Sequence, residues 1–210
     1  MRVWAAATSA NASTRAMLPD FPPLPPVELD PLPYEMQLDA RPLSQIDLVV
    51  IHCTETPTLE SARSFGERVL YTGSGTGNSG HYYIDRDGRI VLYVRPERIA
   101  HHVRGFNQRS IGIELVNTGR YPHWRDSKHQ AMDEPYPEAQ ITALLALLAQ
   151  LREQHPSIRY IAGHEDLDTE MEAALDDASV LVPRKRDPGP QFPWQRVMDA
   201  VGWERLMPKE

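Results

Sequence analysis

Residues 46–51 form an almost unbroken apolar run, rich in β-branched side chains. A strand exposed on one face alternates apolar and polar residues, whereas a continuous run is typical of a central strand covered on both faces. Residues 158–162 form a second run of this kind, and residues 110–116 alternate apolar positions with Gly112 and Glu114. These segments predict strands of one sheet, whose apolar faces are expected to be covered by helices.

Two segments supply helices. Residues 137–156 begin and end with proline, which is tolerated in the first turn of a helix and ends one elsewhere. A shorter helix is predicted from Thr56, as N-cap, with Pro57 at the first helical position. The apolar residues at helical spacing are Ile141, Leu144, Leu145, Leu148 and Leu151 in the long helix, and Leu59, Ala62, Phe65 and Val69 in the short one.

Residues 81–84 and 89–93 flank an Asp-Gly turn and predict a β-hairpin. Hairpin strands and long amphipathic helices in one chain favour an α/β domain with a mixed central β-sheet flanked by helices. Residues 71–80, rich in glycine, serine and threonine, are expected to form a loop.

The first 44 residues differ in composition from the rest. Eight of the 19 prolines lie between Pro19 and Pro42, and proline fixes φ and removes backbone donors. Residues 1–44 are therefore expected to form an extended Pro-rich arm, either a linker or a strap over the domain, with a spacer favoured. The domain itself is predicted to span residues 45–210. The apolar run near Met1 is shorter than the ~7–15 residues of a working signal-peptide core, so we do not expect an intact signal peptide here.

The charge balance excludes some partners. With 22 basic and 29 acidic side chains the net charge is -7, which argues against nucleic acid as a partner. No apolar stretch approaches the ~20 residues of a transmembrane segment. The single cysteine, Cys53, forbids an intrachain disulfide and does not decide the compartment. The sequence leaves the oligomeric state open.

Three residues at the edges of predicted elements suggest a metal centre. His52 ends the first predicted strand, His164 follows the last, and Asp187 lies among prolines. Two imidazoles and a carboxylate are the three protein ligands of a catalytic zinc site, whose fourth position is left to water. A zinc ion held in this way favours hydrolysis of an amide or an ester.

Two further residues are candidates for the chemistry. Lys185 lies two residues before Asp187, so in an extended segment both side chains point the same way, and an ammonium there stabilises an oxyanion. Glu114 faces either the metal, where it exchanges protons, or solvent. Lys185 is otherwise a solvated member of the Arg-Lys-Arg run.

Five ordered motifs carry a resemblance to a known family. They are His52 after its strand, residues 81–88 (HYYIDRDG), residues 107–115 (NQRSIGIEL), Gly163-His164, and residues 184–190 (RKRDPGP). The chain resembles the zinc-dependent N-acetylmuramoyl-L-alanine amidases, relatives of peptidoglycan recognition proteins.

The resemblance implies hydrolysis of the amide between N-acetylmuramic acid and L-alanine in peptidoglycan or muropeptide fragments. It implies Zn²⁺ held by His52, His164 and Asp187, with Glu114 and Lys185 as the catalytic pair. The loop of His101 and His102 borders the substrate cleft in this family. We therefore expect His81, His102 and Asn107 to contact substrate, and His102 to line the cleft without binding the metal.

Aspartate as third ligand resembles the bacterial recycling and periplasmic amidases, whereas phage and animal members use cysteine there. Gly80 stands where the phage and animal branch has tyrosine, so no tyrosine role carries over. The periplasm or cell envelope is the expected compartment, with the cytoplasm as the alternative. The alternative function is a non-catalytic peptidoglycan-binding module, which would be expected to lack Asp187 or Lys185. A zinc hydrolase of other substrates is a more distant alternative.

The stretch between His164 and Pro183 holds seven acids and no lysine or arginine. Residues 169–172 have the form of a capping box, and apolar residues then recur at helical spacing. We expect a short amphipathic helix over residues 169–180, beside the cleft, where it biases which substrate reaches the metal. Cys53 is expected to be buried, on the strand face opposite His52.

Overall fold

Seven strands form the central sheet of the computed structural model, which describes residues 21–207. The strands are β1 (Val27–Leu29), β2 (Leu48–Cys53), β3 (Tyr82–Ile84), β4 (Ile90–Leu92), β5 (Ser110–Leu115), β6 (Tyr160–Gly163) and β9 (Glu204–Arg205). They lie in the order β1-β4-β3-β5-β2-β6-β9, and only the β3–β4 pair is antiparallel. The predicted mixed α/β sheet is confirmed.

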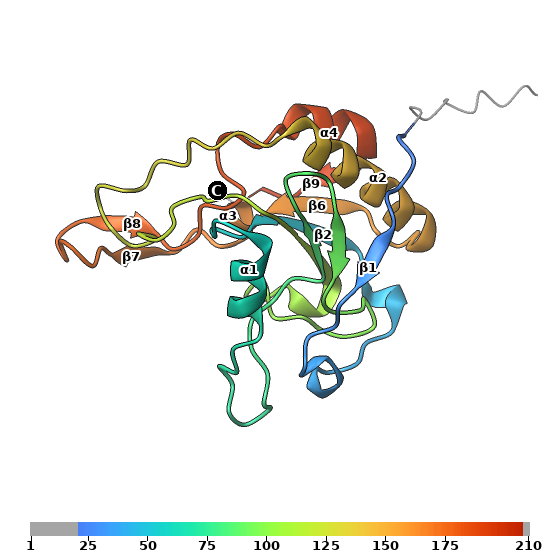
Figure 1. The fold of residues 1–210 in the computed structure, drawn as a ribbon, viewed down its shortest axis with the longest axis horizontal. Helices are drawn as coiled ribbons and strands as arrows, with labels where there is room; N and C mark the ends of the chain where they lie inside the picture. The colour runs from blue at the N-terminus through green and yellow to red at the C-terminus, as the bar shows by residue number, and fades with distance from the viewer. Residues whose placement is uncertain (1–20, 208–210) are drawn as a thin grey trace, which may run out of the picture.

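Helices cover both faces of this sheet (Figure 1). Helices α2 (Glu138–Gln154) and α4 (Trp194–Val201) lie on one face, where Val49 and Ile51 of β2 join the same buried cluster as the α2 leucines. Helix α1 (Leu59–Gly66) packs on the other face against Tyr83 of β3. All five residues of the predicted long-helix stripe are buried. No helix among residues 21–207 is long and apolar enough to cross a lipid bilayer.

Helix α1 begins later than the sequence suggests. Its N-cap is Thr58, whose side chain accepts a hydrogen bond from the Ser61 N–H at 3.1 Å. The prediction of Thr56 as N-cap is wrong because the Thr56 hydroxyl bonds instead to Thr54 Oγ1, at 3.0 Å, inside the preceding turn. Val69 lies beyond the end of the helix and is 53% exposed, so it is not part of the apolar stripe.

The proline-rich segment is bound to the domain wherever the structure describes it. Strand β1 pairs in parallel with β4, and Leu32, Tyr34 and Leu38 are buried beneath the sheet with residues of α1. Short 3₁₀ turns at Glu35–Gln37 and Leu43–Gln45 follow. The expectation of a spacer is therefore wrong for residues 27–44, which form the strap, because their apolar side chains complete the core. The part of the arm before residue 21 lies outside the described residues.

The predicted helix over residues 169–180 is wrong. This stretch is a two-stranded hairpin of β7 (Met171–Ala173) and β8 (Leu181–Pro183), preceded by the one-turn helix α3 (His164–Leu167). A helix here would place Asp176 and Asp177 at its C-terminus, where the helix dipole disfavours acids. The acids instead bond elsewhere: Asp177 caps the turn through Ser179, and Glu172 pairs with Arg125 at 3.0 Å.

Strand register places the ends of three strands at one edge of the sheet. Strands β5 and β6 both run parallel to β2, and His52 stands directly opposite Glu114. Because β6 ends at Gly163, His164 emerges at the same edge. Parallel strands present their carboxyl ends together, so residues far apart in sequence meet there.

We predict that Leu148→Ala lowers the free energy of unfolding by ~2–5 kcal/mol, because it empties a fully buried position of α2. Leu175→Ala is the matched control. Leu175 is 78% exposed on the hairpin, and its truncation should change stability by less than about 0.5 kcal/mol. Urea unfolding followed by circular dichroism measures both, and equal losses would contradict the assigned core.

Candidate active site

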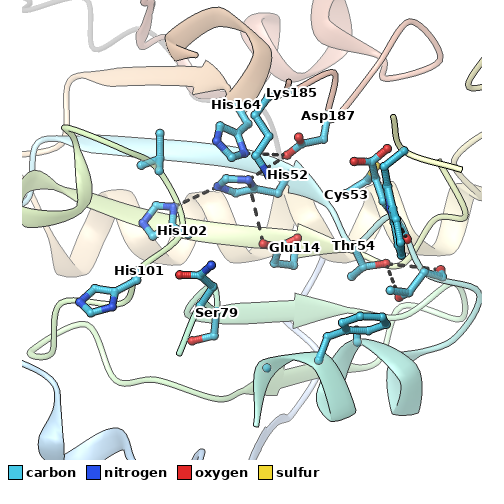
Figure 2. Close-up of a pocket in the computed structure, with 18 of the residues that line it drawn as sticks. His52, Cys53, Thr54, Ser79, His101, His102, Glu114, His164, Lys185 and Asp187 are labelled. Carbon is cyan, nitrogen blue, oxygen red and sulfur yellow. Dashed lines mark hydrogen bonds and ion pairs between the residues drawn. The ribbon is translucent and has the colours of Figure 1, made fainter. Parts of the chain in front are cut away.

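His52, His164 and Asp187 converge in one buried cluster (Figure 2). One ligand atom from each lies within 4.8 Å of the others, and the three residues are 2–3% exposed. Asp187 Oδ2 lies 2.9 Å from His52 Nδ1 and 3.1 Å from His164 Nδ1. Two strand ends and the loop after β8 thus bring together the three predicted ligands.

The electrostatics of this cluster suit a divalent cation. Burial alone would raise the pKa of Asp187, but charge and hydrogen bonds from His164 and His52 hold it well below its usual range. Burial lowers the pKa of His164, which favours a neutral imidazole. Among residues 21–207, Asp187 pairs only with the two histidines, and its Oδ1 has no hydrogen-bond partner. A buried carboxylate beside two imidazoles is a donor set that could hold a metal ion.

Glu114 faces this cluster from the neighbouring strand. Its Oε1 lies 4.0 Å from His52 Nδ1, and burial raises its pKa to about 7, with Asp187 adding to the rise and His52 opposing it. The absence of a side chain at Gly80 makes room for it, because a Cβ there would lie 2.7 Å from Glu114 Cγ. Of the two orientations open to Glu114, the structure has the inward one.

Lys185 lies beside His164 and Asp187 and lines the same cavity as Glu114 (Figure 2). The cavity has a volume of about 700 Å³. Its wall also includes residues of α1 and of the loop after β5, among them Phe65 and Trp124. The two rings meet edge to face with centroids 6.1 Å apart. They add apolar surface to a cavity that charged side chains also line.

The three residues expected to contact substrate have different positions. His81 is fully buried and does not line the cavity; its Nδ1 accepts a hydrogen bond from the Gly112 N–H at 3.0 Å. The prediction that His81 contacts substrate is therefore wrong: it turns into the core beneath the cavity. His102 and Asn107 do line the cavity, and Asn107 Oδ1 also accepts from the backbone N–H groups of His102 and Val103.

Gly112 lies directly against the ring of His102. A Cβ at Gly112 would lie 2.6 Å from His102 Nδ1, so the glycine accommodates the His102 ring. That ring lies against His52, with His102 Nδ1 3.0 Å from His52 Nε2. Cys53, as expected, is buried, and burial raises the pKa of its thiol well above the usual value.

No sequence pattern pointed to one buried ion pair beside the cavity, between Arg120 and Glu55. Arg120 binds both carboxylate oxygens of Glu55, at 2.7 and 2.9 Å. It also donates to the carbonyl of Pro183 at 2.8 Å, and more weakly to that of Arg184. Arg120 therefore ties the turn after β2 to the backbone that leads into Lys185.

Comparison with known proteins identifies the family. The sequence profile of the family described as Amidase_2, N-acetylmuramoyl-L-alanine amidase, matches residues 42–190. The chain belongs to this family. The resemblance inferred from the five motifs is confirmed.

Two curated relatives and one solved structure give the sequence identity and the share of each chain that the similarity covers. The N-acetylmuramoyl-L-alanine amidase AmiD of Escherichia coli is 29% identical over 182 residues, 77% of this chain and 57% of AmiD. The 1,6-anhydro-N-acetylmuramyl-L-alanine amidase AmpD of Enterobacter cloacae is 33% identical over 54% of this chain and 51% of AmpD. The chain thus spans little more than half the length of these relatives.

A structure of Escherichia coli AmiD contains anhydro-N-acetylmuramic acid-L-Ala-D-gamma-Glu-L-Lys as substrate. It superimposes with a TM-score of 0.57 at 26% identity, over 76% of this chain and 58% of AmiD.

We predict that Arg120→Gln costs ~3–5 kcal/mol of unfolding free energy, because it leaves the Glu55 carboxylate buried without a counter-charge. Arg196→Gln is the matched control. Arg196 pairs with Glu138, whose side chain is 73% exposed, so its loss should cost about 1 kcal/mol at most. Denaturant unfolding measures both free energies. A small loss of unfolding free energy for Arg120→Gln would contradict a stabilising role of the buried Arg120–Glu55 pair.

Proposed function

We propose that this chain hydrolyses the amide that joins the lactyl group of N-acetylmuramic acid to L-alanine, in peptidoglycan or muropeptide fragments. One observation carries the proposal. His52, His164 and Asp187 form a buried donor cluster, and Glu114 Oε1 lies 4.0 Å from His52 Nδ1 in the same cavity. Membership of the amidase family gives this arrangement its substrate class.

We infer that His52 and His164, through Nδ1, and Asp187, through Oδ2, hold a zinc ion, because these atoms already face one another. When bound, zinc supplies a Lewis acid that polarises a carbonyl and lowers the pKa of a water to about 7. The unpartnered Oδ1 of Asp187 supports a cation at this position.

The protein's own side chains then handle protons and charge. With a pKa of about 7, Glu114 both accepts and returns a proton near neutral pH. Its carboxylate takes the proton from the attacking water and delivers it to the L-alanine nitrogen as the C–N bond breaks. The Lys185 ammonium stabilises the oxyanion on the attacked carbonyl. The products are the free muramic carboxylate and the stem peptide.

His102 and Ser110 are proposed to orient His52 in this site. Burial lowers the pKa of His102 well below its usual value, so its ring is neutral and offers one donor and one acceptor. Ser110 Oγ donates to the Phe106 carbonyl at 2.9 Å and can then accept from His102 Nε2 at 3.2 Å. His102 Nδ1 is left to accept from His52 Nε2 at 3.0 Å.

With a cation bound, the direction of these hydrogen bonds keeps the proton of His52 on Nε2 and leaves to the cation the lone pair of His52 Nδ1, the nitrogen that faces Asp187. Metal-binding histidines generally donate their other N–H to a fixed partner, which sets the tautomer. We therefore infer that His102 supports a metal ligand, in addition to lining the cavity.

The bound substrate of AmiD makes anhydro-muropeptides the first compounds to test. Release of free stem peptide from purified muropeptides tests the activity directly. Binding without release would favour the non-catalytic module, although the presence of Asp187 and Lys185 argues for an enzyme. We also propose the cell envelope as the compartment, since polymeric peptidoglycan lies there. Fractionation of the source cells, with the cytoplasm as the alternative outcome, tests it.

We predict that Glu114→Gln and Lys185→Ala retain zinc but lose ~10²–10⁴-fold in kcat, the range typical of acid–base groups. Asp187→Ala should instead lose zinc together with activity, because it removes a ligand. Glu153→Gln, on the exposed side of α2, is the control and should match the parent. The measurements are stem-peptide release and zinc content by atomic absorption. Wild-type turnover of Lys185→Ala would exclude its assigned role.

We also predict that His102→Phe weakens zinc binding ~10–100-fold, because His52 loses the acceptor that fixes its tautomer. His102→Asn, which keeps an acceptor near the Nδ1 position, should restore part of this loss. His101→Phe changes the adjacent cavity residue and should bind zinc as the parent does. Competition with a chromogenic chelator gives the affinities without an activity assay. Unchanged affinity of a folded His102→Phe variant would disprove the support role.

A further inference from the structure

A second cluster of metal-binding side chains lies in the loop between β5 and α2. His123, Asp126 and His129 each offer one ligand atom, and these atoms lie within 4.8 Å of one another. Asp126 Oδ1 lies 2.8 Å from His129 Nδ1, and the two imidazole rings are 4.6 Å apart, tilted by 32°. The set of donors is the same as in the buried cluster, two histidines and one aspartate.

The backbone explains why these three residues meet. Successive tight turns link them: the N–H of His123 donates to the Arg120 carbonyl at 2.7 Å, that of Asp126 to His123 at 3.0 Å, and that of His129 to Asp126 at 3.3 Å. A chain that turns every three residues presents positions i, i+3 and i+6 on one side. The spacing His-x₂-Asp-x₂-His therefore becomes a convergent set of side chains.

We propose that His123, Asp126 and His129 form a second site, for a divalent transition-metal ion of the zinc class. Imidazole and carboxylate ligands suit zinc and its neighbours. The site is open to solvent, since the side chain of His129 is 55% exposed and that of Asp126 25%. Water completes the coordination, and the affinity is lower than at the buried cluster, whose ligands are held by the surrounding core.

The loop that carries this site borders the active-site cavity. Trp124, between the first two ligands in sequence, lines the cavity and donates from Nε1 to the Glu55 carbonyl at 3.2 Å. Ser127, between the second and third, bonds through its N–H and its hydroxyl to Asp176 of the hairpin, each at 2.7 Å. A metal ion here would therefore stabilise the loop that joins the cavity rim to the hairpin. This role is structural and independent of the proposed function.

Titration of the tag-free, metal-depleted chain with Zn²⁺ alone tests the proposal. The expected result is two equivalents, one tight and one weaker. His123→Gln and His129→Gln should each keep the tight equivalent and weaken the second at least tenfold. Asp187→Ala should lose the tight equivalent and keep the weaker one, which separates this site from the buried centre. Lys128→Gln, in the same loop but not a ligand, should retain both.

Calorimetry gives the stoichiometry, and circular dichroism verifies that each variant is folded. Histidine ring signals in NMR spectra of the Asp187→Ala variant identify the ligands, because Zn²⁺ should shift those of His123 and His129 first. A single equivalent in the parent chain would overturn the proposal, as would a second equivalent that survives both substitutions.

Discussion

The parallel pairing of β2 with β5 and β6 is the constraint on which the candidate site depends. His52 lies opposite Glu114 in this register, and His164 follows the end of β6 at the same sheet edge. A shift of one residue in β2 would turn the His52 side chain to the face covered by α2, and the same shift in β5 would turn Glu114 there. The buried apolar positions of β2, which pack on both faces, hold this register and thereby fix the spacing of the site.

Two carboxylates in this site, Asp187 and Glu114, are placed in opposite electrostatic conditions. Two histidines contact Asp187 and hold its pKa well below the usual range, in spite of burial. Glu114 lacks such close partners, so burial raises its pKa to about 7. The same side-chain chemistry thus yields a permanent anion suited to a cation and a group able to exchange protons near neutrality.

Segments outside the central sheet shape the cavity and support its walls. The strap of residues 27–44 adds a strand and apolar side chains to one face. Arg120 joins the turn at Glu55 to the backbone before Lys185, and the β7–β8 hairpin is tied to the loop after β5. Charged side chains make the Arg120 contacts and the hairpin contacts, and both sets link chain segments that are remote in sequence.

Local pattern alone was enough to predict the central strands, the long helix and the three candidate metal ligands. A continuous apolar run such as residues 48–51 has few alternatives to a buried strand, and the α2 stripe follows directly from helical spacing. The direction of His81, the start of α1 and the hairpin at residues 171–183 depended on tertiary structure. The hairpin depends on partners distant in sequence, such as Arg125 for Glu172, and the turn before α1 is held by the Asn117 carbonyl, which accepts from the Thr56 N–H at 3.1 Å. Short-range periodicity carries no information about such partners, so only the folded chain reveals them.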